Sequence, residues 1–188
     1  MLALAGLKRL GMNDLIDGMK NGSHESNGMK VSVMSTDSFI PAVAQGAIGI
    51  QCRSNDENAL TYLRALNDAR CELAVDVERT FLAALDGDCR TPIAGHARLE
   101  AVDGQADAVR MVFDGLISKP DGCAALRVRR EGVVFRWLDN DSELPAGVVE
   151  EARRLGKDAA DEVRVRAGIH FHEYKDAVNA ALAQSKGS

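Results

Sequence analysis

The chain has 188 residues, of which 46% are hydrophobic and 27% are charged, and its formal net charge at pH 7 is −5. A chain of this length and composition can bury a hydrophobic core and form one or two domains. The negative net charge argues against a nucleic-acid-binding surface, and no apolar run approaches the roughly 18–20 residues that span a bilayer. We therefore expect neither nucleic acid nor a membrane among its partners.

The first 38 residues divide into an apolar segment and a polar one. Residues 1–17 carry leucines at helical spacing, which predicts a helix. Lys8 and Arg9 follow the apolar run, whereas the charges of a signal peptide precede it, so the chain would begin inside a helix, as a fragment does. Residues 18–38 are rich in Gly, Asn and Ser, which predicts a weakly structured polar loop, either disordered or inserted.

An apolar stretch with several glycines comes next. Residues 39–53 read Phe-Ile-Pro-Ala-Val-Ala-Gln-Gly-Ala-Ile-Gly-Ile-Gln-Cys-Arg, which predicts a buried strand that ends in a glycine-rich turn. Ser54 and Glu57 fit a capping box, with Ser54 as the N-cap of a following helix. The inward face of that helix would consist of Ala59, Leu60, Leu63 and Leu66.

A second helix is predicted over roughly residues 70–85, because apolar residues recur every four positions: Leu73, Val77, Phe81 and Leu85. The period then changes to two, which predicts three antiparallel strands near residues 97–101, 109–113 and 126–128. A final helical stripe between Val149 and Val163 could cover their apolar face. The expected fold class is therefore α+β, with helices on one face of a three-stranded antiparallel sheet.

Two groups of side chains favour ordinary structural roles. Arg127, Arg129 and Arg130 are interpreted as a solvated strand face. His170 and His172 could share one face of a strand, but no third ligand has suitable spacing, so no metal site is expected.

The four cysteines, at positions 52, 71, 89 and 123, form no Cys-x-x-Cys pair, and they suit a reducing compartment. Cys89 differs from the others in its surroundings, Gly-Asp-Cys-Arg-Thr-Pro-Ile-Ala-Gly over residues 87–95. A thiol on a glycine-containing turn beside Arg90 favours thiolate character and nucleophilic chemistry. A buried structural cysteine is the alternative that the residues alone leave open.

The two loop motifs, residues 39–53 and 87–95, and the helices between them resemble the porphobilinogen deaminase (hydroxymethylbilane synthase) family. The resemblance covers residues 2–17 and 39–167 and corresponds to the C-terminal half of that family. It implies that residues 1–53 are a remnant of the family's periplasmic-binding-protein-like α/β domains, with a polar insertion at 18–38. Residues 54–167 would form the C-terminal cofactor-anchoring α+β domain, and residues 168–188 a tail.

The resemblance also implies a transferase of tetrapyrrole (haem and chlorophyll) biosynthesis, which joins four porphobilinogen molecules head to tail and releases ammonia. Cys89 would carry a dipyrromethane cofactor through a thioether, as the primer on which the polypyrrole chain grows. Gln45, Gly46 and Ala47 would bind the carboxylates of this cofactor through backbone N–H groups. Close backbone packing is the alternative role of this glycine-containing loop, and both roles are compatible.

Charged residues complete the implied site. Arg9 and Lys8 would bind the acidic side chains of the substrate or of the growing chain, because a guanidinium group binds carboxylates with two hydrogen bonds. An exposed helix end is the alternative for this pair. Arg53, Glu78 and Arg79 match charged family positions, and we interpret Glu78 and Arg79 as an ion-pair network that supports the cofactor loop.

No residue of this chain is assigned a catalytic role, because the family's catalytic aspartate lies in its N-terminal half, before the matched residues. The alternatives are a truncated, non-catalytic C-terminal module of the enzyme and a ferredoxin-like binding domain unrelated to tetrapyrroles. The second of these leaves the Cys89 motif unexplained. We expect a monomer in the cytoplasm or in a plastid.

Overall fold

The computed structural model describes residues 4–13, 16, 24–26, 29–88, 91–119, 121–137 and 144–174. The chain forms two compact units, Met1–Phe39 and Ile40–Ser188. No helix in the described part of the chain is long and apolar enough to span a membrane.

The first unit contains the helix α1, Leu4–Arg9, and a hairpin of the strands β1, His24–Ser26, and β2, Met29–Val31. The prediction of a helix over residues 1–17 is wrong in length. Gly11, at φ +73°, donates its N–H to the Lys8 carbonyl, and Met12 donates to the Leu7 carbonyl, each at 3.1 Å. These two hydrogen bonds form a Schellman motif, which ends α1. The hairpin lies within the segment that was predicted as a polar loop.

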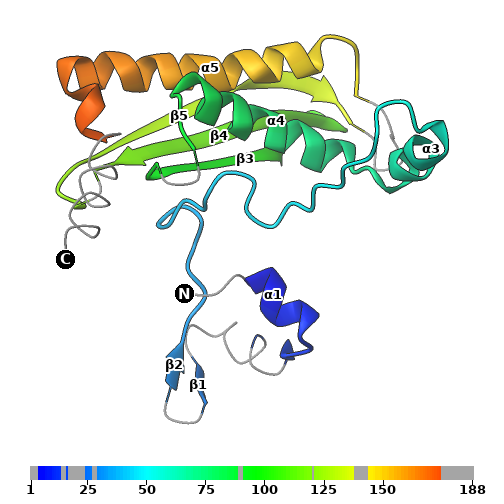
Figure 1. The fold of residues 1–188 in the computed structure, drawn as a ribbon, viewed down its shortest axis with the longest axis horizontal. Coiled ribbons are helices and arrows are strands. Elements are labelled where there is room, and N and C mark those ends of the chain that lie inside the picture. The colour runs from blue at the N-terminus through cyan, green and yellow to red at the C-terminus, as the bar shows by residue number, and fades with distance from the viewer. Residues whose placement is uncertain are drawn as a thin grey trace. The chain divides into compact units, whose positions relative to one another are not determined.

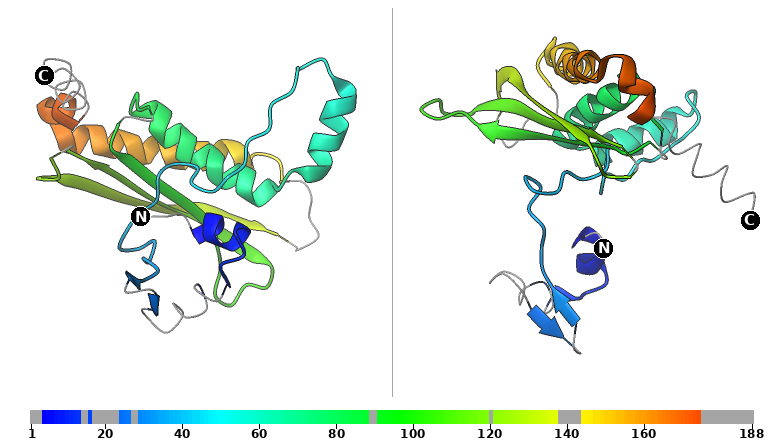
Figure 2. Two further views of the ribbon diagram at one scale, coloured as in Figure 1. Left: turned by 60° about the horizontal axis from the view of Figure 1, so that its bottom comes forward. Right: turned by 90° about the vertical axis from the view of Figure 1, so that its left-hand side faces the viewer.

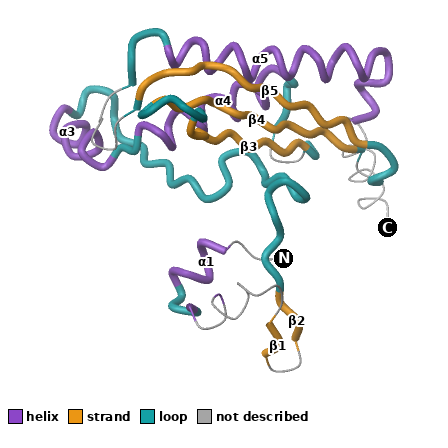
Figure 3. Tube along the Cα trace, turned by 180° about the vertical axis from the view of Figure 1, so that it is seen from behind, coloured by secondary structure: helices purple, strands orange, loops and turns teal. Residues whose placement is uncertain are grey.

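The second unit contains the domain core. Its helices and strands follow in the order α3 Glu57–Leu66, α4 Ala69–Ala84, β3 Ile93–Ala101, β4 Ala108–Ser118, β5 Ala125–Arg136, α5 Val148–Ala167 and the 3₁₀ helix η1 Gly168–His170. The strands form an antiparallel sheet in the order β3-β4-β5. The helices α4 and α5 cover one face of this sheet (Figures 1 and 2), and α5 lies along its length when seen from behind (Figure 3). The predicted α+β fold class is confirmed.

The core lies between the two helices and the sheet. The residues of the predicted α4 stripe, Leu73, Val77, Phe81 and Leu85, are all fully buried. Phe81 packs edge-on against Phe113 of β4, with 5.0 Å between ring centroids. The helices α4 and α5 approach closely at Gly156, where an added Cβ atom would lie 2.5 Å from the Val77 carbonyl oxygen. This contact explains a glycine in the middle of α5.

The prediction of a buried strand over residues 39–53 is wrong. Only Ala42 pairs with another strand, through an isolated antiparallel bridge to Ala94 of β3. Ala44 and Gly46 take the positive φ angles +58° and +87°, which turn the chain out of an extended conformation. Beyond this turn, Ile48 and Ile50 are 76% and 59% exposed.

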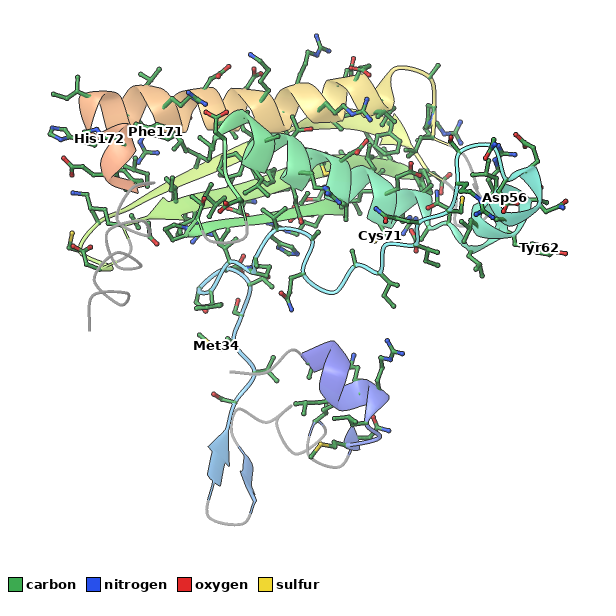
Figure 4. The ribbon with its side chains drawn as sticks, in the orientation of Figure 1. Met34, Asp56, Tyr62, Cys71, Phe171 and His172 are labelled. Atoms are coloured by element: carbon green, nitrogen blue, oxygen red, sulfur yellow. The ribbon has the colours of Figure 1, made fainter. Side chains whose placement is uncertain are left out.

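The start of α3 also differs from the sequence prediction. The N-cap is Asp56, whose carboxylate accepts the Ala59 N–H at 3.0 Å, rather than Ser54. None of the residues of α3 is fully buried, and Leu66, expected on the inward face, is 71% exposed. Figure 4 shows Tyr62 of this helix pointing outward. The apolar face of α3 is therefore only partly buried against the rest of this unit.

Candidate functional site

The two loop motifs meet at the beginning of β3. On one side, the Pro41 carbonyl accepts the Gly95 N–H at 3.0 Å, next to the Ala42–Ala94 bridge. The Val43 side chain packs closely over Gly95, where an added Cβ atom would lie 3.2 Å from the Val43 methyl carbon. On the other side, the motif of residues 87–95 runs directly into β3. The first residues of this strand therefore fix one end of each motif.

Glu78 of α4 joins the first loop to the sheet. Its buried carboxylate accepts the Ala44 N–H at 2.6 Å through Oε2 and the Ala97 N–H at 2.8 Å through Oε1. Burial raises the pKa of Glu78 above its ordinary value, and the two backbone hydrogen bonds offset this effect only in part. The predicted ion-pair network between Glu78 and Arg79 is not what holds the loop. Adjacent residues of a helix point about 100° apart, and Arg79 is exposed.

The turn that carries Gln45, Gly46 and Ala47 is exposed. Two of its amides bond within the turn: Gln45 N–H donates to the Ala42 carbonyl at 3.0 Å, and Ala47 N–H donates to the Ala44 carbonyl at 3.1 Å. Within the described residues, the Gly46 N–H and the Gln45 side chain have no hydrogen-bond partner. In this loop, the Gly46 N–H and the Gln45 side chain are therefore the groups left to bind the cofactor carboxylates.

Cys89 and Arg90 lie outside the described residues, but the residues on both sides of them are described. Asp88 donates its N–H to Thr91 Oγ1 at 3.1 Å, and Thr91 donates its N–H to Asp88 Oδ1 at 3.2 Å. The Thr91 N–H also lies 3.1 Å from the Asp88 carbonyl oxygen, which accepts it. These hydrogen bonds join Asp88, the residue before positions 89 and 90, to Thr91, the residue after them. Sequence reasoning missed this pair, although an Asp-x-x-Thr spacing is typical of side-chain-stabilised turns.

The remaining charged candidates are exposed to solvent. Lys8 and Arg9 are exposed at the end of α1, in the first unit. Arg53 is exposed, and in the described part of the chain its only recorded contact is a backbone one, from the Asp56 N–H to its carbonyl at 3.1 Å. Lys8 and Arg9 thus belong to the first unit, and Arg53 and Glu78 to the second.

A second charged cluster lies on the face of the sheet that α4 and α5 leave uncovered. Asp114 of β4 is only 2% exposed, and its carboxylate meets Arg98, Arg127 and Arg129 at 2.8, 3.2 and 3.4 Å. Arg127 and Arg129 are exposed, in agreement with their interpretation as a solvated face, and each also pairs with this buried carboxylate, which the sequence did not indicate. Burial raises the pKa of Asp114, but the hydrogen bonds and charges of the arginines outweigh burial and lower it below its ordinary value.

The histidine pair also differs from expectation, because it lies at and beyond η1 rather than on a strand. The His170 Nδ1 atom lies 2.6 Å from a Glu173 carboxylate oxygen, and the His172 Nδ1 atom lies 2.8 Å from the Ile169 carbonyl oxygen. Figure 4 labels His172 at this end of α5. Among the described residues, no three His, Cys, Asp or Glu side chains are grouped as metal ligands.

The fold and the site define an α+β protein in which a glycine-containing turn and a cysteine-bearing loop are attached to the same strand. Comparison with known families gives two matches. Residues 72–164 match the porphobilinogen deaminase C-terminal domain, and residues 1–61 match the porphobilinogen deaminase dipyrromethane cofactor binding domain. The chain belongs to the porphobilinogen deaminase family.

Individual relatives give the same result. The chain is 41% identical over 171 residues to the chloroplastic porphobilinogen deaminase of Pisum sativum, a match that covers 91% of this chain and 37% of the relative. It is 40% identical to the porphobilinogen deaminase of Nitrobacter hamburgensis, with 91% and 43% covered, and to the chloroplastic one of Oryza sativa subsp. japonica, with 92% and 39% covered. The chain therefore spans about two fifths of the length of these relatives.

Proposed function

We propose that this chain is the cofactor-anchoring part of a hydroxymethylbilane synthase, which condenses four porphobilinogen molecules head to tail and releases ammonia. The single observation that supports this proposal best is the attachment of both motif loops to β3, one through the Ala42–Ala94 bridge and Glu78, the other directly through Ile93. The relatives named porphobilinogen deaminase support the same reaction.

Cys89 is the proposed attachment point of the cofactor. A thiolate is a soft nucleophile, so it adds readily to the electrophilic methylene carbon that a porphobilinogen unit presents once its amino group has left as ammonia. A dipyrromethane bound in this way would supply the primer to which further pyrrole units are joined.

The described residues near this loop suit an acidic cofactor. Gly46 and Gln45 offer hydrogen-bond donors on an exposed turn, and donors of this kind bind carboxylates. Glu78 holds that turn by accepting the Ala44 N–H, so its role is to support the loop. Lys8, Arg9 and Arg53 are exposed cations, and we propose that Lys8 and Arg9 bind the acetate and propionate groups of the pyrroles while Arg53 supports the site.

The experiment that tests this proposal is an intact mass of the purified chain, followed by a peptide map. We expect a dipyrromethane adduct on the peptide that contains Cys89. The adduct should be lost in the Cys89→Ala variant and kept in the Cys52→Ala variant, because Cys52 is a free, exposed thiol outside the loop of residues 87–95. A folded wild-type chain that takes up no adduct after incubation with porphobilinogen would contradict the proposed anchoring role.

A second candidate is a non-catalytic module of the same enzyme. The coverage of the relatives favours it, because the matched chains extend well beyond the 37–43% that this chain covers. Porphobilinogen consumption by the purified chain separates the two candidates. Uroporphyrin, formed after acid oxidation of the product, would exclude the non-catalytic module, whereas an adduct on Cys89 without consumption of porphobilinogen would support it.

A further inference from the structure

The end of α4, five residues before Cys89, is stabilised in an unusual way. The Gly87 N–H donates to the Leu82 carbonyl and the Asp86 N–H donates to the Ala83 carbonyl, each at 2.9 Å. This pair of bonds is a Schellman motif, in which the residue before the last donor takes the left-handed conformation. That residue is usually glycine, but here it is Asp86, at φ +50°. A non-glycine residue in this conformation costs roughly 1–2 kcal/mol, so the surroundings have to compensate for it.

Arg164 of α5 supplies the compensation from a distant part of the chain. Its Nε and Nη2 groups both donate to the Ala84 carbonyl, at 2.9 and 2.6 Å. The Schellman bonds leave this carbonyl of the last helical turn without an intrahelical donor. Nη2 also lies 2.9 Å from Asp86 Oδ2, so the same guanidinium group pairs with the residue at positive φ.

The guanidinium group is itself held in place. Its central carbon lies 5.1 Å from the centroid of the Phe171 ring, which Figure 4 labels just beyond the end of α5. A cation on the last turn of α5 would be favourable without any partner, because it offsets the helix dipole. That general effect does not account for the three hydrogen bonds that Arg164 donates to Ala84 and Asp86.

From these contacts we propose that Arg164 is a positioning residue for Cys89, an inference that rests on the proposed anchoring role of that cysteine. By capping α4 and pairing with Asp86, Arg164 fixes the direction in which the chain leaves the helix. It also pairs with a carboxylate that stands three residues before Cys89 in the sequence. The Cα atoms of Asp86 and Cys89 are at most about 11 Å apart, because consecutive Cα atoms are 3.8 Å apart.

The test is the rate at which iodoacetamide alkylates Cys89 in molecules that the intact mass shows to be free of dipyrromethane, because a thioether at Cys89 leaves no thiol to alkylate. The rate is measured against pH by peptide mass spectrometry. Cys52, Cys71 and Cys123 are free and exposed, so they serve as internal references in the same molecule. In Arg164→Met the Asp86 carboxylate loses this cation, which should raise the apparent pKa of Cys89 and slow its alkylation at pH 7.5 by about twofold, the effect of one charge at roughly 10 Å in water. In Asp86→Gly the rate should rise instead, since the cation remains without its partner.

Two further variants keep the inference testable if Arg164→Met folds poorly. The double variant Asp86→Gly, Arg164→Met removes both charges and places glycine at the left-handed position, so the Cys89 profile should return toward that of the wild type. Arg166→Met is the matched control, because Arg166 lies on the same helix end but donates to the Arg127 carbonyl of β5. An identical Cys89 profile in the wild type, Arg164→Met and Arg166→Met would overturn the inference.

The adduct measurement separates this inference from the proposed function. A wild-type chain without dipyrromethane would contradict the anchoring role, whatever the alkylation rates. A wild-type chain that takes up dipyrromethane as fast as Arg164→Met, with unchanged alkylation, would contradict the positioning role alone.

Discussion

At the scale of single residues, Glu78 shows how a buried charge can join two segments without an ion pair. Each carboxylate oxygen accepts one backbone N–H, one from the loop and one from β3. A buried amide that loses its acceptor costs about 1–3 kcal/mol. Glu78 is therefore the side chain of α4 whose chemical identity matters most to the candidate site.

We predict that Glu78→Gln destabilises the chain by about 1–3 kcal/mol, because one carboxylate oxygen is replaced by an NH₂ group that faces an N–H donor. Urea unfolding measures this loss. Glu72→Gln is the matched control, since Glu72 is exposed on the same helix, and its effect should stay below about 0.5 kcal/mol. Equal losses in the two variants would contradict the role assigned to Glu78.

The loss should also depend on pH. The pKa of Glu78 is raised in the folded state, so its stabilising contribution is fully present below the unfolded pKa of about 4.3 and decreases as pH rises through the folded pKa. The difference in unfolding free energy between wild type and Glu78→Gln should therefore shrink between about pH 4.3 and neutral pH. A difference that grows with pH would show that the sign of this pKa shift is wrong.

The sequence could predict some of the candidate residues but not their partners. The position of Glu78 beside a loop motif was found from the resemblance, yet its bonds to Ala44 and Ala97 depend on residues 34 and 19 positions away. Arg164 was missed for the same reason, because its partners lie 78 and 80 positions earlier in the chain. Spacing along a chain reports local contacts, and these contacts are not local.

At the scale of helices and strands, periodicity predicted the elements that bury a full face. The four-residue stripe of α4 and the alternation in β3, β4 and β5 both correspond to core residues. Hydrophobic periodicity gave a wrong prediction for residues 39–53. This apolar run was interpreted as a buried strand, although Ile48 and Ile50 near its end are exposed. Positive φ angles at Ala44 and Gly46 decide that segment, and an alanine gives no signal of such an angle.

The sheet is also held by the charged cluster on its uncovered face. Asp114 and Arg129 are paired across β4 and β5, while Arg98 and Arg127 are their diagonal neighbours on β3 and β5. One buried carboxylate thus connects all three strands. The strand alternation could not reveal this connection, because it indicates which face a residue occupies but not its partner.

We predict that Asp114→Asn costs about 3 kcal/mol of unfolding free energy, near the lower end for a broken buried ion pair, because the arginines are partly exposed. The contribution of Asp114 is present above its unfolded pKa of about 3.9 and is lost as pH falls through its lowered folded pKa. Urea unfolding between pH 3 and 7 should therefore show wild type converging on the variant at the acid end. Asp107→Asn, which removes an exposed pairing with Arg136, should cost under about 1 kcal/mol.

At the scale of the whole molecule, the core belongs to one of the two units. The buried cluster and the hydrophobic residues packed against it come from positions 43–174, and none of the described residues of Met1–Phe39 belongs to it. The proposed substrate ligands Lys8 and Arg9 lie in the other unit. The division of the chain thus separates the residues of the core from the two proposed ligands Lys8 and Arg9, while Gln45 and Gly46 lie in the same unit as the core.

This division leads to a prediction for a shortened chain of residues 40–188. Its thermal unfolding midpoint should lie within about 4 °C of that of the full chain, since 1 kcal/mol corresponds to about 2–4 °C in a chain of this size. A fall of about 10 °C or more would mean that the first unit contributes several kcal/mol to the fold, contrary to the composition of the core.

If Lys8 and Arg9 bind carboxylates of the pyrroles, the shortened chain should take up less dipyrromethane on Cys89 than the full chain. The full-length Arg9→Met variant should show a similar decrease without a change in the midpoint, because Arg9 is exposed. Equal uptake by all three proteins would instead restrict the cofactor site to residues after Phe39.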